Sequence, residues 1–214
     1  MHALTENKIQ KLITRRNSNI YIRCKIALRF SVLFIIGFAL GIAFFNYATS
    51  KESLDLGIIS KHFLSIFVNC DTISDYLITM LAASEGGIRH LLFIFISGFT
   101  YFCFLASATI IFSRGVLLGF SLAYMVYAHG VIPGEVSIAI IILYLTSHLV
   151  SAILMVHLAT VSYIFSFDFR AIKLNHSVLR RAPITYRYSF AFILALGGIL
   201  INNLLYCIIS KILL

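Results

Sequence analysis

Charged residues are scarce in this sequence. They make up 12% of the 214 residues, while apolar residues make up 60%. An average soluble domain has about 25% charged residues. The shortage is concentrated in long stretches without any charge, and several of these reach the roughly 20 residues that a helix needs to cross a bilayer. The composition therefore excludes an ordinary soluble protein and leaves little sequence for a separate soluble domain.

The sequence also lacks the motifs of common catalytic and metal sites. Its four cysteines form no CxxC pair, so no zinc knuckle or disulfide framework can be identified, although a bridge between Cys70 and Cys207 remains open. It contains no intramembrane HExxH, no GxSG with a suitable serine–histidine pair and no P-loop. We therefore expect no enzyme activity, no cofactor and no bound metal.

Five apolar runs fill most of the chain instead. They cover residues 30–49, 91–112, 116–132, 136–165 and 188–210. Runs of this length predict transmembrane helices, so we expect an all-α, polytopic membrane protein with five spans. A basic arm over 1–29 precedes a single membrane domain over 30–214. The first run is longer than the apolar region of a cleavable signal peptide, which predicts an uncleaved anchor.

Two longer connections separate the predicted spans. Residues 50–90 are acidic on balance, and apolar residues recur in them at helical spacing, which predicts short amphipathic helices on the membrane surface. Gly86 and Gly87 are expected to break the chain before the second span. Residues 166–187 form a basic loop of the cytoplasmic type.

The basic residues are unequally distributed between the two sides of these spans. With 1–29, 113–115 and 166–187 placed inside, 13 of the 17 Lys and Arg residues lie inside and four lie outside. The positive-inside rule counts only these residues. It predicts an amino terminus inside, a carboxyl terminus outside, and a multi-pass protein of the cell membrane. Topology and anionic lipid explain the basic charge better than nucleic acid binding does.

Glycines recur where helices are expected to meet. A three-residue link, Ser-Arg-Gly, separates the second and third runs, which predicts a tight antiparallel hairpin. In this hairpin Arg114 reaches the headgroups, and Gly115 and Gly119 allow close contact. In the first span, Gly37 and Gly41 have GxxxG spacing, which lets helix backbones approach closely, although glycine is also common in membrane helices in general.

A few polar residues lie inside the predicted spans. The run 136–165 would extend about 45 Å as one helix, against a hydrocarbon core of about 30 Å, so we expect it to tilt, protrude or break, with a break near His148. His148 suits either a polar site or a structural role, bonded to a neighbouring helix or lying near the membrane interface. For His157 we favour the structural role. Asn202 and Asn203 predict interhelical hydrogen bonds ahead of a ligand site.

The stretch from Phe112 to Val126 reads Phe-Ser-Arg-Gly-Val-Leu-Leu-Gly-Phe-Ser-Leu-Ala-Tyr-Met-Val. It contains a basic residue, Arg114, before Gly115, and a second glycine, Gly119, four residues later. In this it resembles the stage II sporulation protein M family, which has such a turn after a long second span. The basic arm, the chain length, the outer loop and the five spans are also similar, so the resemblance loosely covers the whole chain. The proline that this family usually carries in the fourth span is missing here.

This resemblance implies a non-enzymatic role. The family's sporulation protein is a membrane scaffold that works with peptidoglycan-remodelling enzymes during engulfment, and the resemblance implies cell-wall hydrolases as partners here. A permease-like subunit of a transporter is the alternative, favoured by the expected break in the fourth span, because discontinuous helices line substrate sites in transporters. An intramembrane enzyme is the third and least favoured class.

Overall fold

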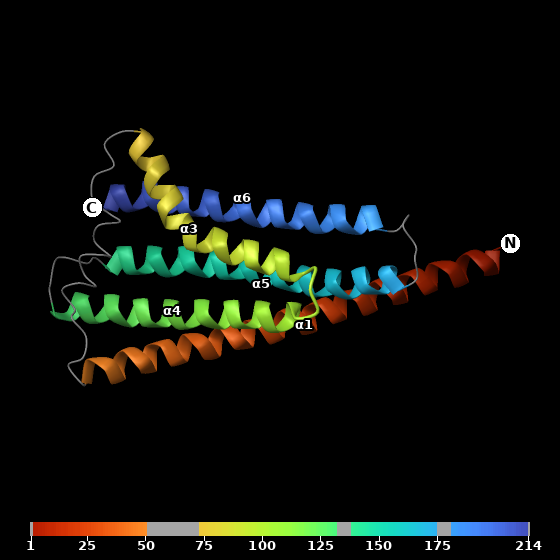
Figure 1. Cartoon of the computed structure of the whole chain (residues 1–214), viewed down its shortest axis with the longest axis horizontal. Helices are drawn as coiled ribbons and strands as arrows, with labels where there is room; N and C mark the ends of the chain where they lie inside the picture. The colour runs from red at the N-terminus through yellow and green to blue at the C-terminus, as the bar shows by residue number, and fades with distance from the viewer. Residues whose placement is uncertain (1, 51–72, 132–137, 175–180, 214) are drawn as a thin grey trace.

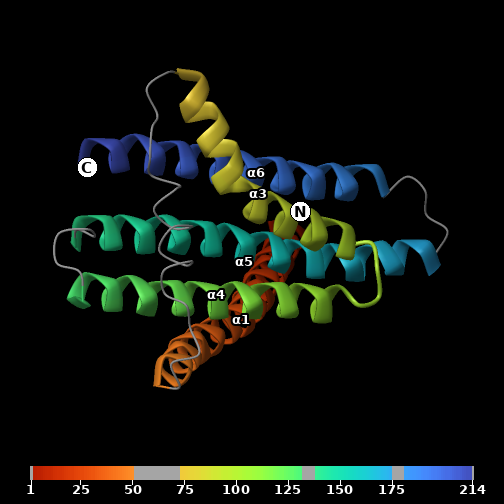
Figure 2. The same ribbon diagram turned by 60° about the vertical axis from the view of Figure 1, so that its left-hand side comes forward.

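The computed structural model describes residues 2–50, 73–131, 138–174 and 181–213, and every regular element in these ranges is an α-helix. The helices are α1 (His2–Ser50), α3 (Ile73–Ser97), α4 (Cys103–Val131), α5 (Ile138–Leu174) and α6 (Arg181–Leu213). α4, α5 and α6 run side by side, and α1 crosses this layer obliquely (Figures 1 and 2). α1 packs mainly against α4, and both α3 and α5 pack against α6.

Each of the five helices contains a segment that is long and apolar enough to cross a membrane. The segments are Ile20–Ser50, Met80–Ser97, Cys103–Tyr127, Ile138–Arg170 and Ile184–Ile209. A helix satisfies its backbone hydrogen bonds internally, which is what a chain needs in hydrocarbon. The predicted all-α fold with five spanning helices is therefore confirmed.

The outer surface of the bundle is apolar, unlike that of a soluble protein, and its largely apolar interior also holds small polar residues. Large apolar side chains face outward; Ile35, Phe44 and Ile153, for example, are 62%, 61% and 66% exposed. Small polar residues lie in the interior: Ser84, Ser97, Ser107, Ser147, Ser151, Thr160, Ser162 and Ser166 are all buried. Lipid tails accept the outward apolar groups, and small residues allow helices to approach closely. The arrangement therefore suits a bundle surrounded by lipid.

The turn between the second and third spans lies elsewhere than predicted. It occupies residues 98–102, and the turn expected at 113–115 is wrong, because α4 continues through that segment without interruption. Arg114 consequently lies in the middle of a helix and not at the headgroups. The hydroxyl of Ser113 donates to the carbonyl oxygen of Ile110 at 2.9 Å, so this residue finds its partner within α4. Nothing local forces the helix to end there.

The turn at 98–102 is held by side chains from α5 and α6. The hydroxyl of Tyr188 donates to the carbonyl oxygen of Phe95 at 2.6 Å, and the hydroxyl of Ser162 donates to the carbonyl oxygen of Ile94 at 2.9 Å. Arg170 donates to the carbonyl oxygen of Thr100 at 2.8 Å. The last carbonyls of a helix have no partner within the helix. Backbone amides of residues 98–100 already bond to the carbonyls of residues 94–97, so the distant side chains add to a turn that is also bonded locally.

α3 begins earlier than the predicted second span. Residues 73–90, which were expected to belong to the outer loop 50–90, form most of this helix. The rest of that loop, 51–72, lies outside the described residues, so the surface helices expected there remain a prediction. The glycine pair before the predicted span does not break the helix. A Cβ atom on Gly87 would lie 3.3 Å from Cγ2 of Ile199, so the small residue serves close packing against α6.

α5 is one unbroken helix of 37 residues, so the break expected near His148 is wrong. Thr146, in the same polar group, donates its hydroxyl to the carbonyl oxygen of Ile142 at 2.7 Å and stays within the helix. A helix of this length extends about 55 Å, which exceeds a hydrocarbon core of about 30 Å. Part of the excess, residues 166–174, falls in the predicted basic loop 166–187, whose last residues begin α6. The remaining 28 residues still exceed the core, so the helix must tilt or protrude.

α1 carries the predicted basic arm and the first span in one continuous helix. It crosses α4 where Gly37 and Gly41 face Gly115 and Gly119, a set that we call the glycine contact. A Cβ atom on any of the four would collide with a backbone carbonyl of the other helix, and one on Gly41 would also lie 2.8 Å from the amide nitrogen of Phe120. Of the two explanations left open for the GxxxG spacing, the structure shows the close approach, with two such motifs meeting face to face.

Candidate functional site

Arg114 lies inside the membrane-spanning part of the bundle. It is partly buried, and its Nη1 atom would be 3.9 Å from a Cβ atom on Gly86 of α3. On its other side it lines a cavity of about 210 Å³ together with Tyr144 and His148 of α5. Phe34 of α1 and Ser121 of α4 complete the polar and aromatic part of this lining. Four helices therefore meet around one guanidinium.

Two histidines accompany this cation. His148 lines the cavity, and the centroid of its ring lies 4.1 Å from that of Tyr144. His90 of α3 lies within electrostatic range of Arg114. The Nδ1 atoms of both histidines are buried and have no hydrogen-bond partner in the described part of the chain. We call Arg114, His90, Tyr144 and His148 the Arg114 site.

No carboxylate balances Arg114 among the residues that the structure describes. The one ion pair there joins Glu85 and Arg89 on an exposed face of α3. Asp168 is 20 residues beyond His148 on α5, or about 30 Å along the helix. A central arginine costs about 2.5–3.5 kcal/mol on membrane-insertion scales, and each unpartnered buried nitrogen costs about 1–3 kcal/mol. Costs of this size identify the Arg114 site as the candidate functional site.

The chemistry of the Arg114 site favours an anion or a neutral polar group as its ligand. The guanidinium donates hydrogen bonds in a fixed planar fork that matches carboxylate and phosphate oxygens. Each imidazole offers one nitrogen that donates and one that accepts when it is neutral. A metal cation is disfavoured, because the permanent positive charge of Arg114 would repel it. We identify no catalytic step that these residues carry out together.

The predicted residues Arg114, Gly115 and Gly119 share α4 but do not act together. The two glycines belong to the glycine contact with α1, whereas the Arg114 side chain is directed toward α3 and α5. Adjacent residues on a helix are rotated by about 100°, so they face different neighbours. The predicted structural turn is thus two separate features, a helix contact and a polar site.

Asn202 and Asn203 both make interhelical hydrogen bonds. Nδ2 of Asn202 lies 2.9 Å from the hydroxyl oxygen of Ser147 and 3.4 Å from that of Ser151, both on α5. Nδ2 of Asn203 donates to the hydroxyl oxygen of Ser84 on α3 at 2.8 Å. Neither asparagine lines the cavity of the Arg114 site. Both therefore link α6 to its neighbours.

Several other residues stand apart from the sequence-based candidates. No sequence pattern marks His90 or Tyr144 of the Arg114 site as functional. Tyr144 lies one helical turn before His148, however, and so shares its face of the helix. His157 is exposed on α5. Cys207 is buried, and Cys70 lies outside the described residues, so a bridge between them stays a prediction.

Fold and site together define a multi-pass helical membrane protein with a cationic, hydrogen-bonding site inside its bundle. The sequence matches no family model, no curated protein and no solved structure. The function therefore has to be inferred from the chain itself.

Proposed function

We propose that this protein is a non-enzymatic scaffold of the cell membrane that organises peptidoglycan-remodelling enzymes during engulfment in sporulation. The observation that carries the proposal is the continuity of its helices. Transporters typically build their substrate sites from discontinuous helices, whereas all five helices are continuous over the described residues. The glycine contact further fixes α1 against α4, backbone to backbone. A fixed arrangement suits a protein that holds partners in place.

The class of partner rests on the resemblance to the stage II sporulation protein M family. That resemblance is carried by the stretch from Phe112 to Val126, in which Arg114, Gly115 and Gly119 match the family pattern. In the structure these residues form the glycine contact and the Arg114 site, not a turn. The glycines thus match the family pattern through a packing role between α1 and α4.

The proposed docking surface is the segment 51–72 together with the first turns of α3. With the amino terminus inside, this segment lies outside the membrane, where wall enzymes act. The first turns of α3 project away from the other helices (Figures 1 and 2). Glu52, Asp55 and Asp71 give the segment its acidic balance, which suits a basic face on a partner.

The test is recovery of partners by the tagged full-length protein from cross-linked membranes of a spore-forming host. We expect cell-wall hydrolases to co-purify, and their loss in the variant Glu52→Gln/Asp55→Asn/Asp71→Asn. The variant Lys51→Gln/Lys61→Gln changes charge in the same segment and should retain them. Deletion of the gene should arrest engulfment and delocalise the hydrolases. Normal engulfment and unchanged hydrolase localisation in the deletion strain would reject the scaffold.

A permease-like subunit is the second candidate, and the Arg114 site favours it. A cation beside a cavity within the spanning part of the bundle is a feature of anion pathways. In proteoliposomes, such a subunit would take up inorganic phosphate or acetate above the level of protein-free vesicles. Arg114→Gln would abolish this uptake, and Arg114→Lys would retain part of it. Uptake of this kind, with co-elution of an ATP-hydrolysing subunit and normal sporulation, would favour transport over the scaffold.

A further inference from the structure

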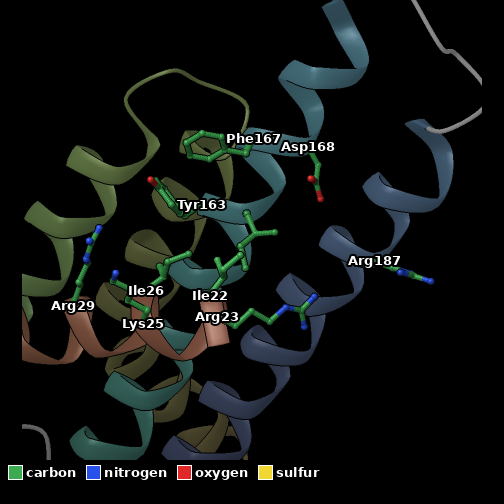
Figure 3. Close-up of a pocket in the computed structure, with 10 residues that line it drawn as sticks. Ile22, Arg23, Lys25, Ile26, Arg29, Tyr163, Phe167, Asp168 and Arg187 are labelled. Carbon is green, nitrogen blue, oxygen red and sulfur yellow. The ribbon is translucent and has the colours of Figure 1, made fainter. Parts of the chain in front are cut away.

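A second and larger cavity lies where α1, α5 and α6 meet. Its volume is about 680 Å³. It is formed by the middle of α1, the last part of α5 and the beginning of α6 (Figure 3). This is the end of the bundle that also holds the 98–102 turn (Figure 1). The cavity is separate from the Arg114 site and shares no lining residue with it.

The charge around this cavity is strongly positive. Arg23, Lys25 and Arg29 of α1 line it together with Arg187 of α6, and Asp168 of α5 is the one acid among its described lining residues. Figure 3 shows these charged groups distributed around the space, with Arg187 further out on α6. Asp168 forms no ion pair with any of the four cations. The cations therefore remain available to an anion.

An apolar strip lies between the cations of α1. Ile22 and Ile26 are four residues apart and share one face of the helix, and Lys25 and Arg29 share the adjacent face. At 100° per residue, Arg23 falls on the other side of the isoleucine pair. Across the cavity, α5 presents further apolar and aromatic side chains, among which Phe167 is 55% exposed. The cavity thus combines cationic edges with an apolar floor.

This combination matches the two parts of a phospholipid. We propose that the cavity binds an anionic phospholipid, with its phosphate against the cations of α1 and an acyl chain along the apolar strip. Basic pockets between transmembrane helices bind the headgroups of anionic lipids. Arginine is well suited to the phosphate, because its planar fork makes two parallel hydrogen bonds to phosphate oxygens. The proposal does not depend on the scaffold function.

The test is a lipid titration of the purified full-length protein, followed by native mass spectrometry. Phosphatidylglycerol should bind about tenfold more tightly than phosphatidylcholine, as expected for several cations near one phosphate. Arg23→Gln/Arg29→Gln should remove this preference, and Arg23→Lys/Arg29→Lys should keep most of it. The double variant Arg89→Gln/Lys211→Gln loses the same charge away from the cavity and should behave as the wild type. Circular dichroism would verify that every variant is folded.

A competition experiment separates a lipid from a free anion as the ligand. Inorganic phosphate, and glycerophosphoglycerol as the headgroup without acyl chains, should fail to displace phosphatidylglycerol at equimolar concentration, because neither contacts the apolar strip. Displacement by inorganic phosphate at that ratio would overturn the lipid proposal. Equal binding of the two phospholipids, or equal loss of preference in the control variant, would overturn it as well.

Discussion

Single polar side chains in this bundle find two kinds of partner. Ser113, Thr146 and Thr109 donate to carbonyl oxygens of their own helix, three or four residues earlier. Asn202 and Tyr188 bond across to other helices. The first kind forms in any isolated helix and adds nothing to packing. The second kind forms only when the helices are assembled, so it is the kind that stabilises the tertiary structure.

This distinction predicts different stability effects at two polar positions. Asn202→Ala should lower the free energy of unfolding by about 1 kcal/mol, since interhelical hydrogen bonds in membranes have about that value. Thr109→Val should leave it nearly unchanged, because the Thr109 hydroxyl bonds only to Leu105 in its own turn. The measurement is reversible unfolding in mixed detergent micelles. Equal effects of the two substitutions would contradict the interhelical role of Asn202.

The hydroxyl of Tyr188 provides a second prediction for a single residue. Tyr188→Phe removes the bonds to the carbonyl oxygen of Phe95 and to the hydroxyl of Ser162 while keeping the ring. It should lower the free energy of unfolding by about 1 kcal/mol. Tyr163→Phe is the matched control, because the Tyr163 hydroxyl makes no hydrogen bond to any described residue. A thermal melt monitored by circular dichroism would detect the difference, and indistinguishable midpoints would contradict it.

Among the helices, the glycine contact between α1 and α4 is the closest approach of two backbones that we describe. Gly119→Ala places a Cβ against the carbonyl oxygen of Phe38 and should lower the free energy of unfolding by about 1–3 kcal/mol. Gly197→Ala meets nothing within 4 Å and should raise it by up to about 1 kcal/mol through helix propensity. The two glycine-to-alanine changes should therefore act in opposite directions.

The measurement for the glycine contact is the same detergent unfolding experiment on both variants. Bulkier replacements, such as Gly115→Leu or Gly119→Leu, should destabilise the fold before they alter the binding of any partner. If Gly119→Ala proved as stable as the wild type, α1 and α4 would have to be further apart than the structure places them.

The ends of the spans were less predictable than their number. Hydropathy locates apolar segments, and all five predicted runs overlap observed helices, but the second run, 91–112, covers the end of α3, the turn and the start of α4. The 98–102 turn escaped prediction because it lies inside the uncharged run 91–112, where hydroxyls from α5 and α6 add to its local backbone bonds. The expected turn at 113–115 failed for the opposite reason, since a single arginine and a glycine do not end a helix whose neighbours accommodate them. Boundaries therefore depend on contacts between distant residues.

For the whole molecule, the basic asymmetry predicts the orientation in the membrane. It persists without Arg114, which lies within a span. In a cysteine-free background, Asp55→Cys and a cysteine added after the carboxyl terminus should react with an impermeant thiol reagent in intact cells. Asn175→Cys and Phe102→Cys should be protected, because the 98–102 turn, the end of α5 and the beginning of α6 lie at one end of the bundle (Figure 1). Labelling at 175 with protection at 55 would reverse the orientation.

The sequence by itself determined that this chain is an all-α membrane protein with five spans. Hydrophobic length is a local property, and a run of about 20 apolar residues satisfies the bilayer whatever its neighbours are. Its glycine spacing also allowed close contact at Gly37, Gly41, Gly115 and Gly119, but it did not determine which glycines meet.

Only the tertiary structure decided that the two glycine pairs face each other and that Arg114 lies among His90, Tyr144 and His148. It likewise brought the cations of α1 to the same cavity as residues of α5 and α6. These features join residues that are far apart along the chain. The spacing of these residues in the sequence does not reveal such contacts, because the packing of helices, and not their formation, determines which faces meet.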